Sequence, residues 1–218
     1  MYPRHSLVWL TAAGWRAARA GAPPEHGAAI DRWRDADWPL VVRRRDPSAG
    51  DAELCAGLAL PPDPVSGDKL RIALRVPLAT VARGAPPLAL KDVLATPPTQ
   101  WRRDLAQLNE AGVGLNLRVY GSLALQTLTG LLYLRPSSDI DLLLIPLTEH
   151  QLRAGLALLR RYAQELPLDG EIVFPNGDAV PWKEWLSAEA SHARVLVKGR
   201  DGVRLAPLNA LLATLRNA

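Results

Sequence analysis

The feature that most constrains the fold is a pair of aspartates at the start of an apolar run. Asp139 and Asp141 lie one residue apart, and the aliphatic residues 142–145 follow them directly. A short apolar run of this kind predicts a buried strand over residues 139–145. Because side chains alternate between the two faces of a strand, both carboxylates point the same way, whereas Ile140, Leu142 and Leu144 face the opposite side.

Two carboxylates on one face of a strand repel each other unless a cation lies between them. Mg²⁺ prefers oxygen ligands and commonly takes one or two carboxylates together with the phosphates of a substrate. The pattern therefore predicts a magnesium site at the mouth of this strand. We expect that site to be open to solvent, above residues that are buried.

A Gly-Ser pair, Gly121 and Ser122, precedes the aspartates and predicts an anion site. Residues 115–120 are typical of a strand, and residues 123–129 are typical of a helix that ends at Gly130. A strand that turns directly into a helix presents unpaired backbone N–H groups at the positive end of the helix dipole. Glycine also lets a phosphate approach the backbone closely. Gly121 and Ser122 are therefore candidate phosphate-binding residues.

The rest of the chain predicts an α+β protein of two domains. Residues 1–85 carry short β-like runs separated by turns, which indicates a small, mostly-β domain. Residues 82–87, with a Pro-Pro pair, suggest the boundary. Residues 86–218 mix strand and helix patterns and predict a mixed sheet with flanking helices. The β-like runs of the first domain are 6–10, 39–43, 55–60 and 70–76, and the second domain's further helices and strands are expected at 99–111, 148–165, 170–174, 182–188, 193–197 and 208–215.

Composition excludes several classes of function. The single cysteine, Cys55, rules out an internal disulfide and a cysteine-built zinc site, and its apolar neighbours favour a buried thiol. The net charge of +4 favours acidic partners such as phosphates, but the charge is too dispersed to indicate nucleic acid. No apolar run reaches the roughly 18 residues needed to cross a bilayer. We therefore expect a cytoplasmic protein with no nucleic-acid or membrane partner.

With these motifs in view, the chain resembles the nucleotidyltransferase superfamily, whose signature is a Gly-Ser turn followed by an Asp-x-Asp strand. The resemblance implies a nucleotidyltransferase-like catalytic domain over residues 86–218. It also implies a third carboxylate on a neighbouring strand. Asp169 and Glu171 share one face of the run 168–174 and are both candidates. We favour Glu171, which lies inside the apolar run, and Asp169 stays open as the alternative.

A closer resemblance covers nearly the whole chain, to the malonate decarboxylase holo-acyl-carrier-protein synthases, a family of phosphoribosyl-dephospho-CoA transferases. The segments that carry it are 3–10, 38–44, 57–61, 119–130, 138–143, 169–171 and 182–184. It implies transfer of phosphoribosyl-dephospho-CoA from 2'-(5''-triphosphoribosyl)-3'-dephospho-CoA to a serine of the apo acyl-carrier subunit of malonate decarboxylase. Pyrophosphate would be released.

The resemblance also implies residue roles. Asp139, Asp141 and Glu171 would hold two Mg²⁺ ions, and Glu171 or Asp169 would accept the serine proton. Gly121 and Ser122 would bind phosphates, and among the arginines we expect Arg71 to join them.

Two other hypotheses stay open on the sequence alone. The chain could be another metal-dependent nucleotidyltransferase, with a small-molecule or protein acceptor. It could also be a non-catalytic nucleotide-binding relative that has kept the fold, although the complete set of acids argues against this.

Overall fold

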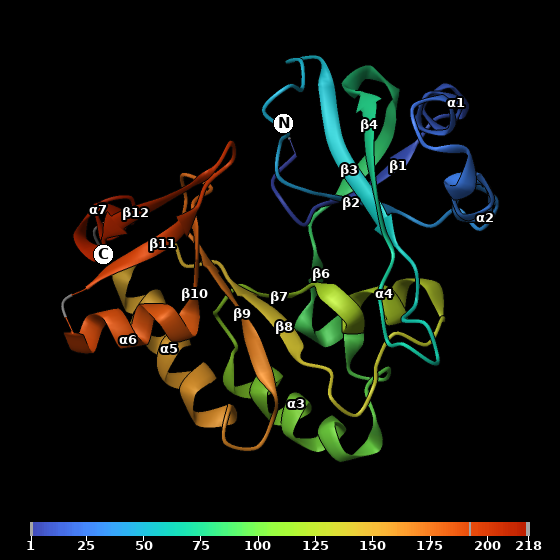
Figure 1. Ribbon diagram of the computed structural model, residues 1–218. Coiled ribbons are helices and arrows are strands. Elements are labelled where there is room, and N and C mark those ends of the chain that lie inside the picture. Colours follow the sequence, from blue (N-terminus) through green and yellow to red (C-terminus); the bar gives the residue numbers. More distant parts are fainter. Residues whose placement is uncertain (1, 192, 217–218) are drawn as a thin grey trace. The chain divides into compact units, whose positions relative to one another are not determined.

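The computed structural model describes residues 2–191 and 193–216, which form two compact units (Figure 1). One unit comprises Met1–Pro87 with Leu128–Tyr133, and the other comprises Leu88–Thr127 with Leu134–Ala218. The expected α+β class, with a mixed sheet flanked by helices, is confirmed. No helix among the described residues is both long enough and apolar enough to cross a membrane.

The first unit is built on a five-stranded sheet, as far as the described residues show, with strand order β4-β3-β2-β1-β5. Its strands β1–β4 match the four β-like runs of the sequence. Two helices and the strand β5 were not predicted, and β5 overlaps the segment 82–87 that the sequence suggested as the domain boundary. The elements are β1 (Leu7–Leu10), α1 (Ala12–Ala20), η1 (Pro24–His26), α2 (Gly27–Asp35), β2 (Leu40–Val42), β3 (Glu53–Ala59), β4 (Arg71–Pro77), η2 (Leu78–Thr80) and β5 (Val81–Ala85).

Alternation along β4 places one face in the core of this unit. Ile72, Leu74 and Val76 are buried, whereas Arg71 and Arg75 are exposed, as the period of two predicts. Cys55, on β3, is a buried free thiol, as expected. The Tyr133 hydroxyl donates a hydrogen bond of 2.7 Å to the carbonyl of Ala59, and this bond ties the segment Leu128–Tyr133 to β3.

The second unit is built on a seven-stranded mixed sheet, counted over the described residues, with strand order β12-β11-β10-β9-β8-β7-β6. The pair β8 and β9 is parallel, and α5 forms the crossover between them. The elements are β6 (Leu88–Ala89), η3 (Leu90–Val93), α3 (Thr99–Ala111), β7 (Leu117–Val119), α4 (Gly121–Thr129), β8 (Ile140–Leu144), α5 (Glu149–Tyr162), β9 (Leu168–Val173), β10 (Ala179–Pro181), α6 (Trp182–Ser191), β11 (Arg194–Lys198), β12 (Val203–Pro207) and α7 (Leu208–Leu212). Strands β6, β10 and β12 were not predicted.

One face of this sheet supplies the core. Ile140, Leu142 and Leu144 of β8 are fully buried and belong to one apolar cluster with residues of α3, α5 and α6, which Figure 1 shows beneath the sheet. Thr148 caps α5 by accepting a hydrogen bond of 3.2 Å from the Gln151 N–H, as the Thr-x-x-Gln pattern predicts. Because Ile140, Leu142 and Leu144 point into this core, the Asp141 side chain lies on the opposite face of β8.

Candidate active site

The two aspartates of the Asp-x-Asp motif lie at the start of β8. The strand begins at Ile140, one residue later than expected, so Asp139 is an exposed residue just before it. Asp141 is the second residue of the strand and is half-buried. Because Ile140 and Leu142 point into the core, Asp141 points to the other face, as the alternation predicts.

Gly121 lies directly against the carboxylate of Asp141. Strands β7 and β8 are antiparallel neighbours, and the Tyr120 N–H donates a hydrogen bond of 3.1 Å to the Asp141 carbonyl. Gly121 has a φ of 69°, and a Cβ atom at this position would lie 1.9 Å from Oδ2 of Asp141. Glycine is therefore required here for two reasons, the backbone conformation and the space that the carboxylate occupies.

The Gly-Ser turn also begins the helix that the sequence predicts. Helix α4 starts at Gly121, and Gly130 follows its last residue with a φ of 71°, which is the left-handed conformation of a helix end. Ser122 is buried, with 8% of its surface exposed. The structure thus brings the Gly-Ser turn and the Asp-x-Asp strand together at one edge of the sheet.

Asp169 is the residue of β9 that lies opposite Asp141. The parallel register pairs Asp141 with Asp169 and Leu143 with Glu171, so all four side chains share one face. Asp169 is half-exposed, and its Oδ1 lies 3.4 Å from Nζ of Lys183. Its carboxylate is therefore both next to Asp141 and accessible.

Glu171 is two residues further along β9 than Asp169, and its carboxylate pairs with a different lysine. It is 4% exposed, and its Oε1 accepts a hydrogen bond of 2.7 Å from Nζ of Lys198. The glycine between the two acids, Gly170, has a φ of 134°, and a Cβ atom there would lie 1.8 Å from the carbonyl oxygen of Leu142. Gly170, which is opposite Leu142, therefore allows the backbones of β9 and β8 to approach closely in this register.

The donors at this edge suit a magnesium ion that is completed by substrate phosphates. Among the described residues, no group of three His, Cys, Asp or Glu side chains is arranged to hold a metal by itself. Asp141 and Asp169 are opposite each other, and Mg²⁺ usually takes only one or two carboxylates together with phosphates and water. The metal set of Asp139, Asp141 and Glu171 stays a prediction.

The predicted arginine lies in the other unit. Arg71 is exposed on β4, so its assignment as a phosphate ligand stays a prediction. Its neighbour Arg75 is engaged in an ion pair with Asp46, with Nε 2.8 Å from Oδ2.

Two lysines contact the acids, and the sequence motifs do not predict either contact. Lys183 and Lys198 come from α6 and β11, and each contacts one of the two candidate third carboxylates. The segment 182–184 belongs to the family resemblance, which was the available signal for Lys183.

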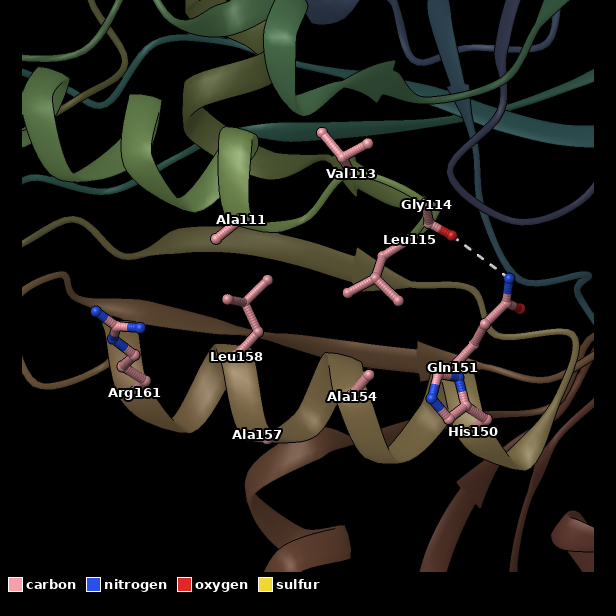
Figure 2. A pocket seen from close by; sticks show the side chains of 10 residues that line it. All are labelled: Ala111, Val113, Gly114, Leu115, His150, Gln151, Ala154, Ala157, Leu158 and Arg161. Atoms are coloured by element: carbon pink, nitrogen blue, oxygen red, sulfur yellow. Dashed lines mark hydrogen bonds between the residues drawn. The ribbon is translucent and has the colours of Figure 1, made fainter.

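A cavity of about 520 Å³ lies away from these residues, between the end of α3 and α5 (Figure 2). Figure 2 shows His150 and Arg161 at opposite ends of its α5 wall, and the Gln151 amide donates a hydrogen bond of 3.4 Å to the Gly114 carbonyl. The residues that line it do not include any of the predicted site residues. None of the acids of β8 and β9 is among its lining residues.

Comparison with known proteins identifies the family. The family model described as the phosphoribosyl-dephospho-CoA transferase MdcG N-terminal domain matches residues 3–87, and the corresponding C-terminal domain model matches residues 89–209. No solved structure matches the chain significantly.

Curated relatives match this chain over almost its full length. A protein of Xanthomonas campestris pv. campestris named phosphoribosyl-dephospho-CoA transferase is 39% identical over 97% of this chain and 97% of its own. Proteins of the same name from Xanthomonas axonopodis pv. citri and Bradyrhizobium diazoefficiens are 39% and 35% identical, over 97% and 93% of this chain and 97% and 88% of their own lengths. The chain belongs to the phosphoribosyl-dephospho-CoA transferase family, and it is a transferase.

Proposed function

We propose that this protein transfers phosphoribosyl-dephospho-CoA from 2'-(5''-triphosphoribosyl)-3'-dephospho-CoA to a serine of the apo acyl-carrier subunit of malonate decarboxylase, with Mg²⁺ as cofactor. The observation that carries the proposal is the arrangement of Gly121, Asp141 and Asp169 at one sheet edge, in a chain of this family. It supports phosphoryl transfer because it combines carboxylates for a cation with a helix N-terminus for phosphate.

The proposed reaction is a substitution at the α-phosphorus of the triphosphate. The serine Oγ forms a bond to this phosphorus, the bond from phosphorus to the bridging oxygen breaks, and pyrophosphate leaves with that oxygen. The serine proton passes to a carboxylate or to water. Magnesium ions bound with the substrate would neutralise the phosphate charge and orient the attacking and leaving oxygens.

Asp141 and Asp169 are the proposed metal-binding pair within the sheet, with Asp139 as a further ligand from the segment before β8. Asp169 is proposed as the third carboxylate in place of the favoured Glu171, for two reasons. Its position opposite Asp141 leaves its carboxylate accessible, whereas the buried Glu171 carboxylate is already neutralised by Lys198.

Gly121 and Ser122 remain the proposed phosphate-binding turn. Because Gly121 admits the Asp141 carboxylate, a metal bound there would lie next to the first turn of α4. Phosphate oxygens could then contact the metal and the helix N-terminus together.

The test is a transfer assay with intact-mass detection. The protein is incubated with Mg²⁺, the triphosphoribosyl substrate and the apo carrier, and we expect the carrier to gain the mass of the prosthetic group on one serine while pyrophosphate accumulates. Chelation of the metal should stop both. A carrier whose serine is replaced by alanine is the matched control. Pyrophosphate release that does not depend on the carrier, with no mass gain, would contradict the proposed acceptor.

A further inference from the structure

Two lysine–carboxylate pairs lie side by side on the acid face of the seven-stranded sheet. Lys198 contacts Glu171 at 2.7 Å, and Lys183 contacts Asp169 at 3.4 Å. Glu171 and Asp169 are two residues apart on β9 and point to the same face. The candidate site therefore contains two cations as well as its acids.

The two pairs differ in how firmly they are held. The Glu171 side chain is 5% exposed and that of Lys198 is 30% exposed, so breaking this pair would leave a buried charge without its partner. The side chains of Lys183 and Asp169 are 56% and 45% exposed. Exposed ion pairs contribute little to stability, so water or another ion can replace either partner at little cost. The outer pair is therefore exchangeable and the inner pair is not.

The position of Lys183 follows from the strand that precedes it. Strand β10 is antiparallel to β9, and its last residue, Pro181, is opposite Glu171. Helix α6 then begins at Trp182. The chain therefore leaves β10 near the first residues of β9, where Asp169 lies. A cation in the first turn of a helix is unfavourable with respect to the helix dipole. The nearby carboxylate of Asp169 offsets that cost.

We propose that Lys183 is the counter-ion of Asp169 in the metal-free protein, and that it becomes a ligand for the phosphate chain once Mg²⁺ takes its place on Asp169. The inference rests on the proposed function, because it takes Asp169 as a metal ligand. When the cation binds, the Lys183 ammonium loses its anionic partner next to the place where the triphosphate would lie. An ammonium on a flexible stem binds phosphate oxygens well. Lys198 stays on Glu171 throughout.

The test separates metal binding from phosphate binding without requiring turnover. Mn²⁺ is used as a spectroscopic substitute for Mg²⁺, and its affinity is measured by electron paramagnetic resonance with no phosphate present. The affinity for inorganic pyrophosphate is measured by calorimetry at saturating Mg²⁺. Lys183→Met and Lys183→Arg are compared with Lys91→Met, which removes an exposed lysine of η3 in the same unit.

Opposite effects are expected in the two measurements. Lys183→Met should bind Mn²⁺ more tightly than the unchanged protein, because the competing cation is gone, and should bind pyrophosphate about tenfold more weakly, because one charge-assisted hydrogen bond is lost. Lys183→Arg should retain most of the pyrophosphate affinity. Lys91→Met should change neither affinity.

The outcomes distinguish this inference from the proposed function. If the unchanged protein modifies the carrier but Lys183→Met keeps both affinities, the role of Lys183 is wrong while the function stands. If Lys183→Met shows the two opposite shifts but no protein modifies the carrier, Lys183 acts as proposed in a different phosphoryl transfer. Thermal unfolding of each variant confirms that the proteins compared are folded.

Discussion

The Cα of Gly121 and the carboxylate of Asp141 are in such close contact that a Cβ atom on residue 121 would lie 1.9 Å from Oδ2. The two residues are 20 positions apart in the chain, in the Gly-Ser turn and in the Asp-x-Asp strand. The contact explains why these motifs belong together, because the carboxylate is positioned by the absence of a side chain at Gly121. Gly121 thus helps to position the Asp141 carboxylate, in addition to its proposed role in phosphate binding.

Gly121→Ala should reduce transfer more than it reduces stability. The methyl group must displace the Asp141 carboxylate, and the left-handed backbone at φ 69° costs about 1–2 kcal/mol for a residue with a Cβ atom. A displacement of about 1 Å at a reacting centre can cost about 100-fold in rate. We expect kcat to fall by at least about tenfold, measured in the carrier-modification assay with urea unfolding in parallel. Gly114→Ala, at a φ of 88° with open space around it, is the matched control for backbone strain.

Asp139→Ala and Asp141→Ala should each abolish transfer while the protein stays folded. Asp139 is exposed, and Asp141 is half-buried, so neither is part of the apolar core. Under the proposed function, loss of a carboxylate that would hold the cation removes the neutralisation of phosphate charge that the cation would supply. The rate should drop by at least about 100-fold, with circular dichroism unchanged. Full activity in both variants would mean that the metal site lies elsewhere.

Asp169→Asn and Glu171→Gln should separate catalysis from stability. Asp169 is accessible and in a weak ion pair, so its amide variant should unfold within about 0.5 kcal/mol of the unchanged protein but lose transfer by about 100-fold or more. Glu171→Gln leaves Lys198 without its buried counter-charge and should cost about 1–3 kcal/mol of unfolding free energy.

The proposed Mg²⁺ requirement gives a second measurement for the same two variants. Asp169→Asn should need more Mg²⁺ for half-maximal rate, whereas the remaining activity of Glu171→Gln should keep the original requirement. The reverse pattern would assign the third carboxylate to Glu171.

The first unit should become less stable at low pH, because the Asp46 carboxylate becomes protonated there. Hydrogen bonds from the Arg43 guanidinium, one of them 2.6 Å to Oδ2, hold the pKa of the Asp46 carboxyl well below its usual range, and Arg75 adds to the effect. A carboxyl whose pKa is lowered on folding stabilises the protein at pH values above its unfolded pKa. That contribution is lost as the pH falls below about 4 toward the folded pKa.

Asp46→Asn should therefore cost about 1 kcal/mol at pH 7, after allowance for the partial exposure of these side chains. It should also flatten the decline of stability between about pH 4 and pH 2. Urea unfolding at several pH values measures both effects. An unchanged acid profile in the variant would show that other carboxyls dominate it.

Long elements with a clear period could be predicted from the sequence, whereas two short helices could not. Helix α3 was expected at its observed bounds because Trp101, Leu105 and Leu108 recur at helical spacing. Helices α1 and α2 have nine residues each, and each buries only three of them. So few apolar positions do not form a distinctive stripe, and helices of this length depend on tertiary packing.

The motifs of the candidate site could also be recognised from short stretches of sequence. Asp139, Asp141, Gly121 and Ser122 are recognisable because a strand, a turn and a helix each leave a short signature in the chain. The contact between Lys198 and Glu171 leaves no such signature, because Lys198 is 27 residues beyond Glu171 and reaches it only through the order of strands β9, β10 and β11.

The sequence by itself determined which faces the side chains of β8 occupy, because alternation in a strand depends on nothing but the chain. It also determined that two acids of the run 168–174, Asp169 and Glu171, share a face. Only the tertiary structure decided which of them is opposite Asp141. That choice is the register of a parallel strand pair joined by α5, and it depends on how the helix packs and on the close approach that Gly170 permits. A shift of two residues would keep every side chain on its own face and would exchange Asp169 for Glu171.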